Sequence, residues 1–512
     1  MTVAARLAKQ GHDVTIYEAS DRTGGKCRTE WIGDYAFDTG PSLLTLPAIY
    51  KDFFLKTGPR FERVLTSTAV NPAFTYNFAD GKRVDFVNLD LPKTCAAIDK
   101  SLGVEAGNAW HSIMQRAEIM WDISRVPFVQ SELTSVWSLL KRRDLIRGIR
   151  EIAPYKSLRK VTKEYTSDKH IQMIIDRYAT YTGSDPRKAP AALLTIAFVE
   201  ASFGAWHISG GIGQLSVALE DRCRLLNIPI HLGSPVASID TSEGTVTGVT
   251  LSTGEKIVAD MVVANADAEL IYNKLLAPDV KAAKPERKKL KRAEKSLAGF
   301  SLLLGLDNSK ISGDIPQLNH HTIYFPENYD AEFDEIFTQK VPVKDPTIYI
   351  CSPNDPKMVK RENTEAWFVL INAPRHDPES GWDWSSGGAE YAAKIIAKLD
   401  ALGLRVSERL EVMEFRTPLD LQNATNAPGG SIYGTSSNGA MSAFSRARNR
   451  SPVKGLFLRW RFRPSRWWAA SCWYECGVSR RGDRQLASEC SRCASRSLEQ
   501  LLVVKPKPLP AL

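Results

Sequence analysis

The 512-residue sequence has no apolar run long enough to cross a membrane and no amino-terminal signal peptide. The longest apolar candidates, around Ala191 to Val199 and Leu297 to Leu306, are short or interrupted. We therefore expect a cytoplasmic protein, and association with a membrane surface stays open. The hydrophobic share of 43% and the charged share of 24% are ordinary for a globular protein and argue against global disorder. The length is sufficient for two or three domains.

The positive charge of the chain is unevenly distributed. The net charge is +9, and from Arg459 onward eleven Lys or Arg stand against four Asp or Glu, which gives +7 there and +2 in the rest. The same tail holds four of the eight cysteines, and their C-x3-C and C-x2-C spacings would suit a zinc-bearing nucleic-acid module. These cysteines are Cys472, Cys476, Cys490 and Cys493. A tail of this composition needs an explanation separate from the rest of the chain.

The most informative stretch runs from residue 14 to residue 42. Val14 to Tyr17 forms a short apolar strand that ends at an acid, Glu18, and a helix-like segment, Thr2 to Lys9, precedes it. This pattern predicts the second half of a βαβ unit, in which the carboxylate at the end of the second strand accepts a hydrogen bond from a ribose hydroxyl of a dinucleotide. On strand and acid alone, a solvated glutamate at a strand end is the simpler interpretation.

The residues after Glu18 favour the dinucleotide. Gly24 and Gly25 let backbone N–H groups approach a pyrophosphate, and Lys26 offsets its charge. The sequence FDTGPS follows at residues 37–42. The whole stretch closely resembles the flavin-binding segment of the FAD-dependent amine oxidase superfamily, and its FDTGPS ending resembles the carotenoid (phytoene) desaturase branch.

One part of that flavin-binding segment is missing from the sequence. The phosphate-binding glycines G-x-G-x-x-G normally lie about 20 residues before the ribose acid, and Glu18 has only seventeen residues ahead of it. We therefore expect the first strand and its glycine turn to lie upstream of this start, because of an internal methionine or a truncated gene. Gly210, Gly211 and Gly213 imitate the fingerprint, but no adequate strand precedes them, so they form a weak phosphate motif.

Residues 93–202 have the periodicity of helices. The segment from Ser138 to Tyr165 is amphipathic and basic, so it could rest on an anionic bilayer or present a solvated charged face. An earlier segment carries apolar residues at the three-to-four spacing of one helix face, which predicts core packing. These residues are Trp110, Ile113, Met114, Ala117, Met120 and Trp121.

Two turn sequences predict β-hairpins: Asp80-Gly81, between YNFA and KRVDFV, and Thr253-Gly254, after the strand Thr245 to Leu251. A further buried-type strand, Met261 to Ala264, ends at the polar Asn265. This arrangement resembles the return of the family's chain to the cofactor, although a purely structural meander would have the same pattern.

Later strands at residues 299–306, 347–351 and 367–373, with an amphipathic helix at 390–402, predict a substrate domain built on a mixed sheet. The sequence HHTIYF begins there with His320 and His321. Adjacent histidines on a strand point to opposite faces and make a poor chelate. We therefore expect no metal site.

The similarity to the family ends near Leu458. Up to that point the chain matches through GSIYG at residues 430–434, and the family then has a turn like V-G-G-S-x-H-P-G-G-G-x-P beside the isoalloxazine ring. The chain instead reads RWRFRPSRWWAASCWYEC from Arg459. Back-translating that string and shifting it by one base permits GGSAHPGGGLPLVGMSAE. We therefore predict a frameshift near Arg459, and we expect a tail without regular helix or strand.

The resemblance covers about Thr2 to Leu458 and implies an α/β fold. The implied architecture is a doubly wound, Rossmann-like FAD-binding domain, incomplete, with a helical plus mixed-sheet substrate domain. The expected divisions are 1–92, 203–295 and 421–458 for FAD binding, 93–202 for a helical, membrane-facing substrate region, 296–420 for the substrate domain and 459–512 for an out-of-frame tail.

The resemblance also implies a function, the FAD-dependent desaturation of a long isoprenoid such as phytoene in carotenoid biosynthesis. Alternatives are a carotenoid end-group oxidase, which GSIYG resembles somewhat more, an isomerase, and a non-catalytic remnant unable to bind FAD. No catalytic acid or base is identifiable, and we expect a membrane-surface partner and no nucleic acid. The expected cofactor set is Glu18 at the ribose, Gly24, Gly25 and Lys26 at the pyrophosphate, Gly40, Pro41 and Ser42 near the flavin, Val236 at the adenine, and also Arg22 and Asn265.

Overall fold

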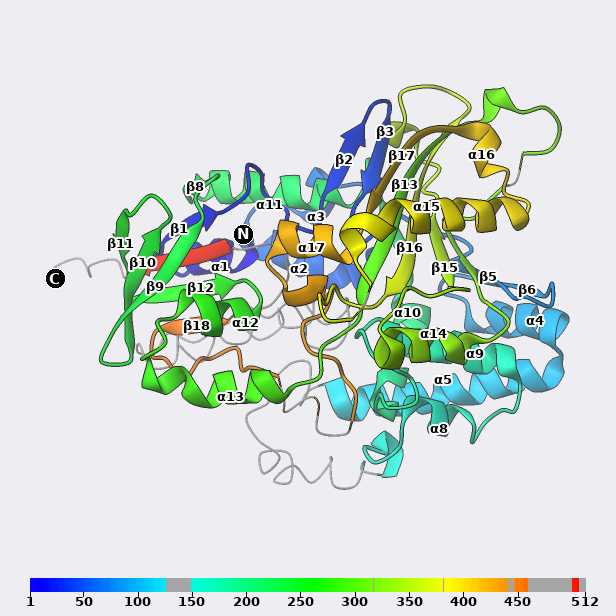
Figure 1. Cartoon of the computed structure of the whole chain (residues 1–512), viewed down its shortest axis with the longest axis horizontal. Coiled ribbons are helices and arrows are strands. Elements are labelled where there is room, and N and C mark those ends of the chain that lie inside the picture. The colour runs from blue at the N-terminus through cyan, green and yellow to red at the C-terminus, as the bar shows by residue number, and fades with distance from the viewer. Residues whose placement is uncertain are drawn as a thin grey trace.

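The computed structural model describes residues 1–125, 148, 150–315, 317–380, 382–439, 442, 446–458 and 500–505. Two large β-sheets organise these residues, one on the left and one on the right of Figure 1, and a group of helices lies below the right-hand sheet. None of the described helices is both long enough and apolar enough to cross a membrane.

The left-hand sheet has five strands in the order β18-β12-β19-β1-β8. Strands β1 and β8 run parallel, as do β12 and β18, while β19 is antiparallel to both of its neighbours. The strands are β1 (Asp13–Glu18), β8 (Ile230–His231), β12 (Met261–Asn265), β18 (Leu456–Leu458) and β19 (Gln500–Lys505). Segments from four distant parts of the chain therefore form one sheet.

Both faces of this sheet are covered, and the side chains of β1 alternate between the two faces. Val14 and Ile16 pack against helices α1 and α11, whereas Tyr17 packs on the other side with residues of β12 and β18. Burial on both faces is typical of a doubly wound sheet. The helices on the first side are α1 (Thr2–Lys9), α2 (Pro47–Thr57), α3 (Phe61–Val64) and α11 (Gly213–Leu225).

A smaller sheet, in the order β11-β10-β9, precedes β12 in the chain. Its β10–β11 hairpin turns at Thr253-Gly254 as predicted, with Gly254 at φ +89°. The elements of this part are β9 (Val236–Ser242), β10 (Thr245–Leu251), β11 (Lys256–Val258), α12 (Ala268–Leu270), η3 (Ile271–Leu275), η4 (Lys281–Ala283) and α13 (Lys284–Arg292).

The right-hand sheet has seven strands in the order β17-β13-β16-β15-β14-β5-β6. Its strands are β5 (Phe74–Asn77), β6 (Arg83–Phe86), β13 (Ala298–Asp307), β14 (His321–Tyr324), β15 (Ile348–Cys351), β16 (Thr364–Ala373) and β17 (Leu410–Arg416). Most neighbours are antiparallel, but β5 and β14 are parallel. The predicted mixed sheet is therefore confirmed.

Strand β13 is buried along its whole length, because both of its faces are covered. Leu302 and Leu304 face the cluster that contains helix α15 (Trp384–Ala401), and Leu303 faces the hairpin of β2 (Thr29–Ile32) and β3 (Tyr35–Asp38). Short elements surround the sheet: η5 (Asn308–Lys310), α14 (Tyr329–Asp334), η6 (Glu335–Gln339), η7 (Pro356–Met358), α16 (Val406–Arg409), α17 (Pro418–Thr425) and η8 (Pro428–Gly430).

The predicted apolar helix face is confirmed, because all six of its residues are buried on α5. By contrast, the helix predicted from Ser138 to Tyr165 is not continuous in its described part. Ala153 has φ +43°, and a new short helix begins at Leu158; residues 138–147 and 149 lie outside the described residues. The helices here are α4 (Leu91–Leu102), α5 (Val104–Ser124), α8 (Leu158–Thr162), α9 (Lys169–Thr180), η2 (Ala191–Leu193) and α10 (Leu194–Phe203).

Two segments differ from their predicted places. The Asp80-Gly81 hairpin forms as predicted, but its strands β5 and β6 extend the right-hand sheet and not the sheet that contains β1. Within the tail, Gln500–Lys505 forms β19, so the expectation of no strand there is wrong. The sheet provides backbone partners on both sides of this segment, which a search for periodicity in the segment itself does not detect. The tail cysteines lie outside the described residues.

Candidate cofactor and substrate site

Glu18 ends β1 and is fully buried, so the solvated alternative is excluded. Its Oε1 accepts a hydrogen bond from the Ser20 N–H at 3.0 Å, and its backbone carbonyl accepts one from the Ser234 N–H at 2.8 Å. The second bond brings the start of β9, and with it the half-buried Val236, close to the end of β1. Two residues that are more than two hundred positions apart therefore border the same end of the sheet.

The bend after β1 depends on glycine. Gly24 and Gly25 have φ of +104° and +57°, a region that side chains disfavour. A Cβ on Gly24 would also lie 2.9 Å from the Cys27 carbonyl oxygen and 3.0 Å from the Ser216 hydroxyl in the first turn of α11. The bend therefore lies against the positive end of that helix, which favours a neighbouring anion.

Lys26 and Gly40 cross at close range. A Cβ on Gly40 would lie 1.9 Å from the Lys26 carbonyl oxygen, so only glycine permits this crossing. The Lys26 Nζ donates to the Ile432 carbonyl at 3.4 Å, within the GSIYG segment. The structure thus brings together the first and third stretches that the resemblance assigns to FAD binding.

The side chain of Arg22 lies near two acids, Asp21 and Glu30. Its half-exposed side chain lies 3.8 Å from Glu30 and 3.9 Å from Asp21. Arg28, which sequence reasoning missed, is nearer the β1 turn, and its Nη2 donates to the Ser20 hydroxyl at 3.5 Å. Burial, followed by repulsion from Arg22, lowers the Arg28 pKa. The only feature of the sequence that indicated Arg28 was its place in Cys27-Arg28-Thr29, shortly after the glycine pair.

Asp38 connects the β2–β3 hairpin to the turn at Gly210 and Gly211, the glycine turn before α11. Its carboxylate is 3% exposed and accepts hydrogen bonds from the Ile212 N–H at 3.0 Å and the Thr29 hydroxyl at 2.6 Å. Burial raises the Asp38 pKa to about 6. A Cβ on Gly211 would lie 2.4 Å from Thr29 Oγ1, so this glycine is explained by close packing.

The FDTGPS segment ends against the right-hand sheet, with Pro41 between Gly40 and the buried Ser42. The Ser42 hydroxyl is 2.7 Å from the Tyr349 hydroxyl, which is 2.7 Å from the His321 Nδ1. This chain of polar groups joins the segment expected near the flavin ring to β14 and β15. The segment that follows β3 therefore meets the right-hand sheet at this point.

Asn265, the last residue of β12, pairs with Gln500 at the start of β19, and Glu18 pairs with the same Gln500 from the other side. Glu18 and Asn265 are thus separated by one strand. The buried carboxylate and the glycine bend fit the sugar and pyrophosphate side of a flavin dinucleotide. In the described residues β19 lies between β1 and β12, and no glycine loop is present there.

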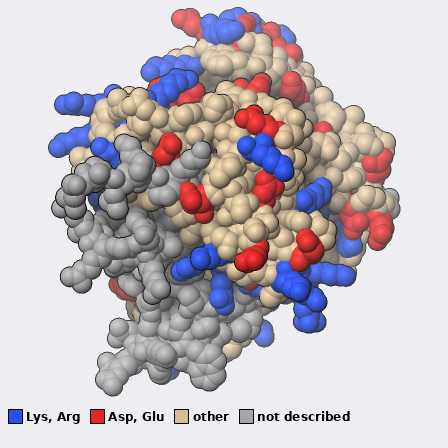
Figure 2. Space-filling view, turned by 90° about the vertical axis from the view of Figure 1, so that its left-hand side faces the viewer, with Lys and Arg blue, Asp and Glu red and all other residues tan. Residues whose placement is uncertain are grey.

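Figure 2 shows how charged side chains are distributed over one face of the molecule. Lys and Arg are interspersed with Asp and Glu over the described part of this face, without a large region of one sign.

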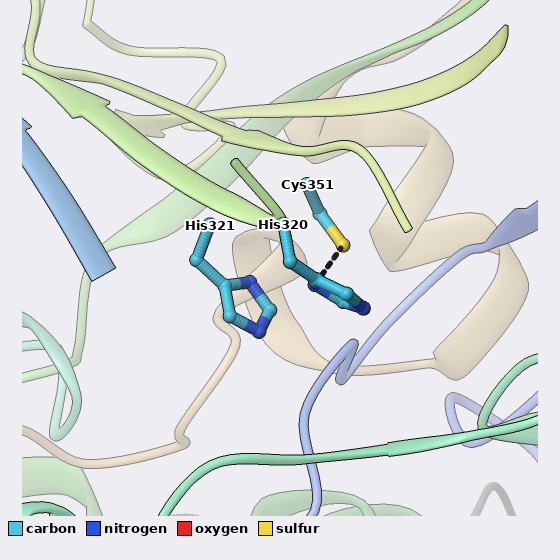
Figure 3. A group of neighbouring side chains, drawn as sticks. All are labelled: His320, His321 and Cys351. Carbon is cyan, nitrogen blue, oxygen red and sulfur yellow. Dashed lines mark hydrogen bonds between the residues drawn. The ribbon is translucent and has the colours of Figure 1, made fainter. Parts of the chain in front are cut away.

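The histidine pair is oriented differently from the prediction. The ring centroids of His320 and His321 are 4.3 Å apart, and the His320 Nδ1 is 3.7 Å from the Cys351 Sγ (Figure 3). The alternation rule fails because His320 precedes β14 and does not have to follow its pleat. His207, also missed, lies beside His320 and is 2.8 Å from an Asp355 carboxylate oxygen.

Comparisons with known proteins agree with this arrangement. Residues 1–297 match the family described as "Flavin containing amine oxidoreductase". The chain is 30% identical to a zeta-carotene-forming phytoene desaturase of Myxococcus xanthus over 90% of this chain and 86% of that protein. It is 28% identical to a 4,4'-diapolycopene oxygenase of a Methylomonas species over 85% of each. In fold it is similar to cyclohexylamine oxidase from Brevibacterium oxydans, with a TM-score of 0.55, 14% identity and coverage of 96% and 94%.

Proposed function

Because the chain belongs to the flavin containing amine oxidoreductase family and is an FAD-dependent oxidoreductase of its carotenoid desaturase branch, we propose that it desaturates a long-chain carotenoid precursor such as phytoene. The observation that carries the proposal is the fully buried carboxylate of Glu18 at the end of β1, beside the Gly24-Gly25 bend. A carboxylate at this place is positioned to accept a hydrogen bond from a ribose hydroxyl.

Bound FAD supplies an acceptor for hydride from an allylic C–H bond, and loss of a proton from the neighbouring carbon completes the new C=C bond. In this proposal Glu18 holds the ribose, residues 24–26 border the pyrophosphate, and Val236 contacts the adenine through its backbone. Residues 40–42 and Asn265 lie nearer the flavin ring. The chain's own contribution is mainly alignment of the substrate at the junction of the two sheets.

The substrate and the exact step belong to the proposal. A long apolar hydrocarbon is delivered most readily from a lipid phase, so we place the protein at a membrane surface. A second candidate, oxidation of a carotenoid end group, is favoured by the GSIYG segment at residues 430–434 and by similarity to the Methylomonas oxygenase. The products separate the two, because desaturation extends the conjugation and adds no oxygen.

The first experiment measures FAD binding by the purified full chain, from its flavin absorption band and from quenching of flavin fluorescence. Glu18→Gln should weaken FAD binding about 10- to 150-fold, because it removes a charge-assisted hydrogen bond worth about 1.5–3 kcal/mol. Glu327→Gln, at an exposed position, is the matched control and should bind like the parent. A colourless parent that shows no saturable quenching would identify a non-catalytic remnant and overturn the proposal.

The second experiment supplies phytoene or a later carotenoid in lipid vesicles to the FAD-loaded protein, with an added electron acceptor, and analyses the products by mass and absorption. A loss of two hydrogens per step, with a shift of absorption to longer wavelength, is the expected result. Gain of oxygen would identify an end-group oxidase. An unchanged mass with altered geometry would identify an isomerase.

A further inference from the structure

Three potential metal ligands converge between β14, β15 and the glycine turn before α11. One nitrogen of each imidazole of His320 and His321 and the Cys351 Sγ all lie within 4.8 Å of one another. His321 and Cys351 are buried, and Figure 3 shows the three side chains on the same side of the two strands. Among the described residues, no other group of this kind was found.

The spacing suits a tetrahedral metal ion. The His320 Nδ1 and the Cys351 Sγ are 3.7 Å apart. A nitrogen and a sulfur that bind one tetrahedral zinc ion, at distances of about 2.1 and 2.3 Å from it, lie about 3.6 Å from each other. His321 completes the set after a ring rotation that closes the widest gap by about 1 Å.

A neighbouring side chain orients one of the proposed ligands by a hydrogen bond, as is common in metal sites. The His321 Nδ1 is hydrogen-bonded to the Tyr349 hydroxyl at 2.7 Å, and such a bond at one ring nitrogen orients the other for a metal. The nitrogen of His320 that would bind the ion is Nδ1, which faces the Cys351 Sγ.

Two acids lie close enough to act electrostatically on the cluster. Asp38 acts on Cys351, while Asp355 acts on His320 and is hydrogen-bonded to the neighbouring His207. Metal binding would displace the Cys351 thiol proton, because the thiolate is the ligand.

We propose that His320, His321 and Cys351 form a binding site for a borderline-soft divalent ion of the zinc class. Two imidazoles and one thiolate suit such an ion better than magnesium or calcium, which prefer oxygen ligands. Three protein ligands leave a fourth position for water or another small ligand. None of its ligands is among the residues assigned to FAD, but His321 is joined to Ser42, which is assigned to the flavin, through the Tyr349 hydroxyl.

The test uses the full chain with Cys472, Cys476, Cys490 and Cys493 replaced by Ser, so that the tail cannot bind metal through thiolates. Cobalt(II) is titrated as the probe, and zinc(II) is then added in competition. A thiolate-to-cobalt absorption band that saturates at one equivalent and is displaced by zinc is the expected result. FAD binding is followed separately in the same samples.

Three variants in that background decide the assignment. Cys351→Ser should abolish the thiolate band, and His320→Gln should weaken cobalt binding at least tenfold. The matched control is Cys95→Ser, at a half-buried cysteine on α4, and should bind like the parent. Circular dichroism checks folding, and if Cys351→Ser fails to fold, His320→Gln decides alone. A parent without saturable binding, a band that survives Cys351→Ser, or unchanged affinity in His320→Gln would overturn the proposal.

Discussion

Replacement of Asp38 by Asn measures how much one buried carboxylate destabilises the fold when it ionises. Burial raises the Asp38 pKa from 3.8 to about 6, and the hydrogen bonds from Thr29 and Ile212 offset only part of this effect. Since a tenfold change in acidity is worth about 1.4 kcal/mol, this rise corresponds to about 3 kcal/mol. The side chain is 3% exposed, so solvent screening does not reduce the figure greatly.

The direction of the effect follows from proton linkage. The folded protein binds the Asp38 proton more tightly than the unfolded chain does, so the stabilisation is complete below about pH 4 and is lost as the pH rises through about 6. The parent should therefore lose about 3 kcal/mol of unfolding free energy from this group between pH 4 and pH 7. Asn does not ionise, and it can still accept from Ile212 and donate to Thr29.

The assay is urea unfolding followed by circular dichroism at pH 4, 5.5 and 7, with a chelator present. The difference in unfolding free energy between Asp38→Asn and the parent should move by about 3 kcal/mol in favour of the variant as the pH rises. Asp21→Asn, at a side chain that is 90% exposed, is the control and should follow the parent. A difference between Asp38→Asn and the parent that is constant with pH would refute this reasoning.

Three other predictions concern packing, charge and the tail. Gly40→Ala should lower the unfolding free energy by about 3 kcal/mol, because the added Cβ would lie 1.9 Å from a backbone carbonyl oxygen. Gly254→Ala, where a Cβ meets nothing within 4 Å, adds only the backbone strain of φ +89° and should lower the unfolding free energy by about 1–2 kcal/mol. Arg177→Met should lower the unfolding free energy by about 3–5 kcal/mol, because Glu200, which is 4% exposed, loses its ion-pair partner. Adding Glu200→Gln to this variant should restore part of the lost melting temperature. Replacing residues 459–512 by the product of the neighbouring frame, which begins GGSAHPGGGLP, should increase FAD retention, and unchanged retention would contradict the frameshift.

Local patterns in the sequence were sufficient for much of the fold. The strand before Glu18 and the strand β13 follow from short apolar runs, and the two hairpin turns follow from their Asp-Gly and Thr-Gly sequences. The buried face of α5 follows from helical spacing. These features depend on residues close together in the chain, so one stretch at a time was enough to predict them.

The contacts that assemble the site could not be predicted in that way. The crossing of Gly40 with Lys26 and the bond from Lys26 to Ile432 depend on how distant segments pack. The orientation of His320 depends on where β14 begins, and a shift of one residue changes the face that a side chain occupies. The pairing of Arg22 with Glu30, a residue of β2, also depends on this packing.

The direction of β19 has a consequence for how phosphate charge is balanced. Its amino end, Gln500, meets the carboxyl ends of β1 and β12, and in the described part of the chain no helix begins from β19 at that edge. Apart from the start of α11, the neutralisation of a pyrophosphate would depend on flexible cations such as Lys26 and Arg28. Because dissolved ions screen side-chain charges more readily than fixed amide dipoles inside a fold, retention of a dinucleotide should fall steeply as ionic strength rises.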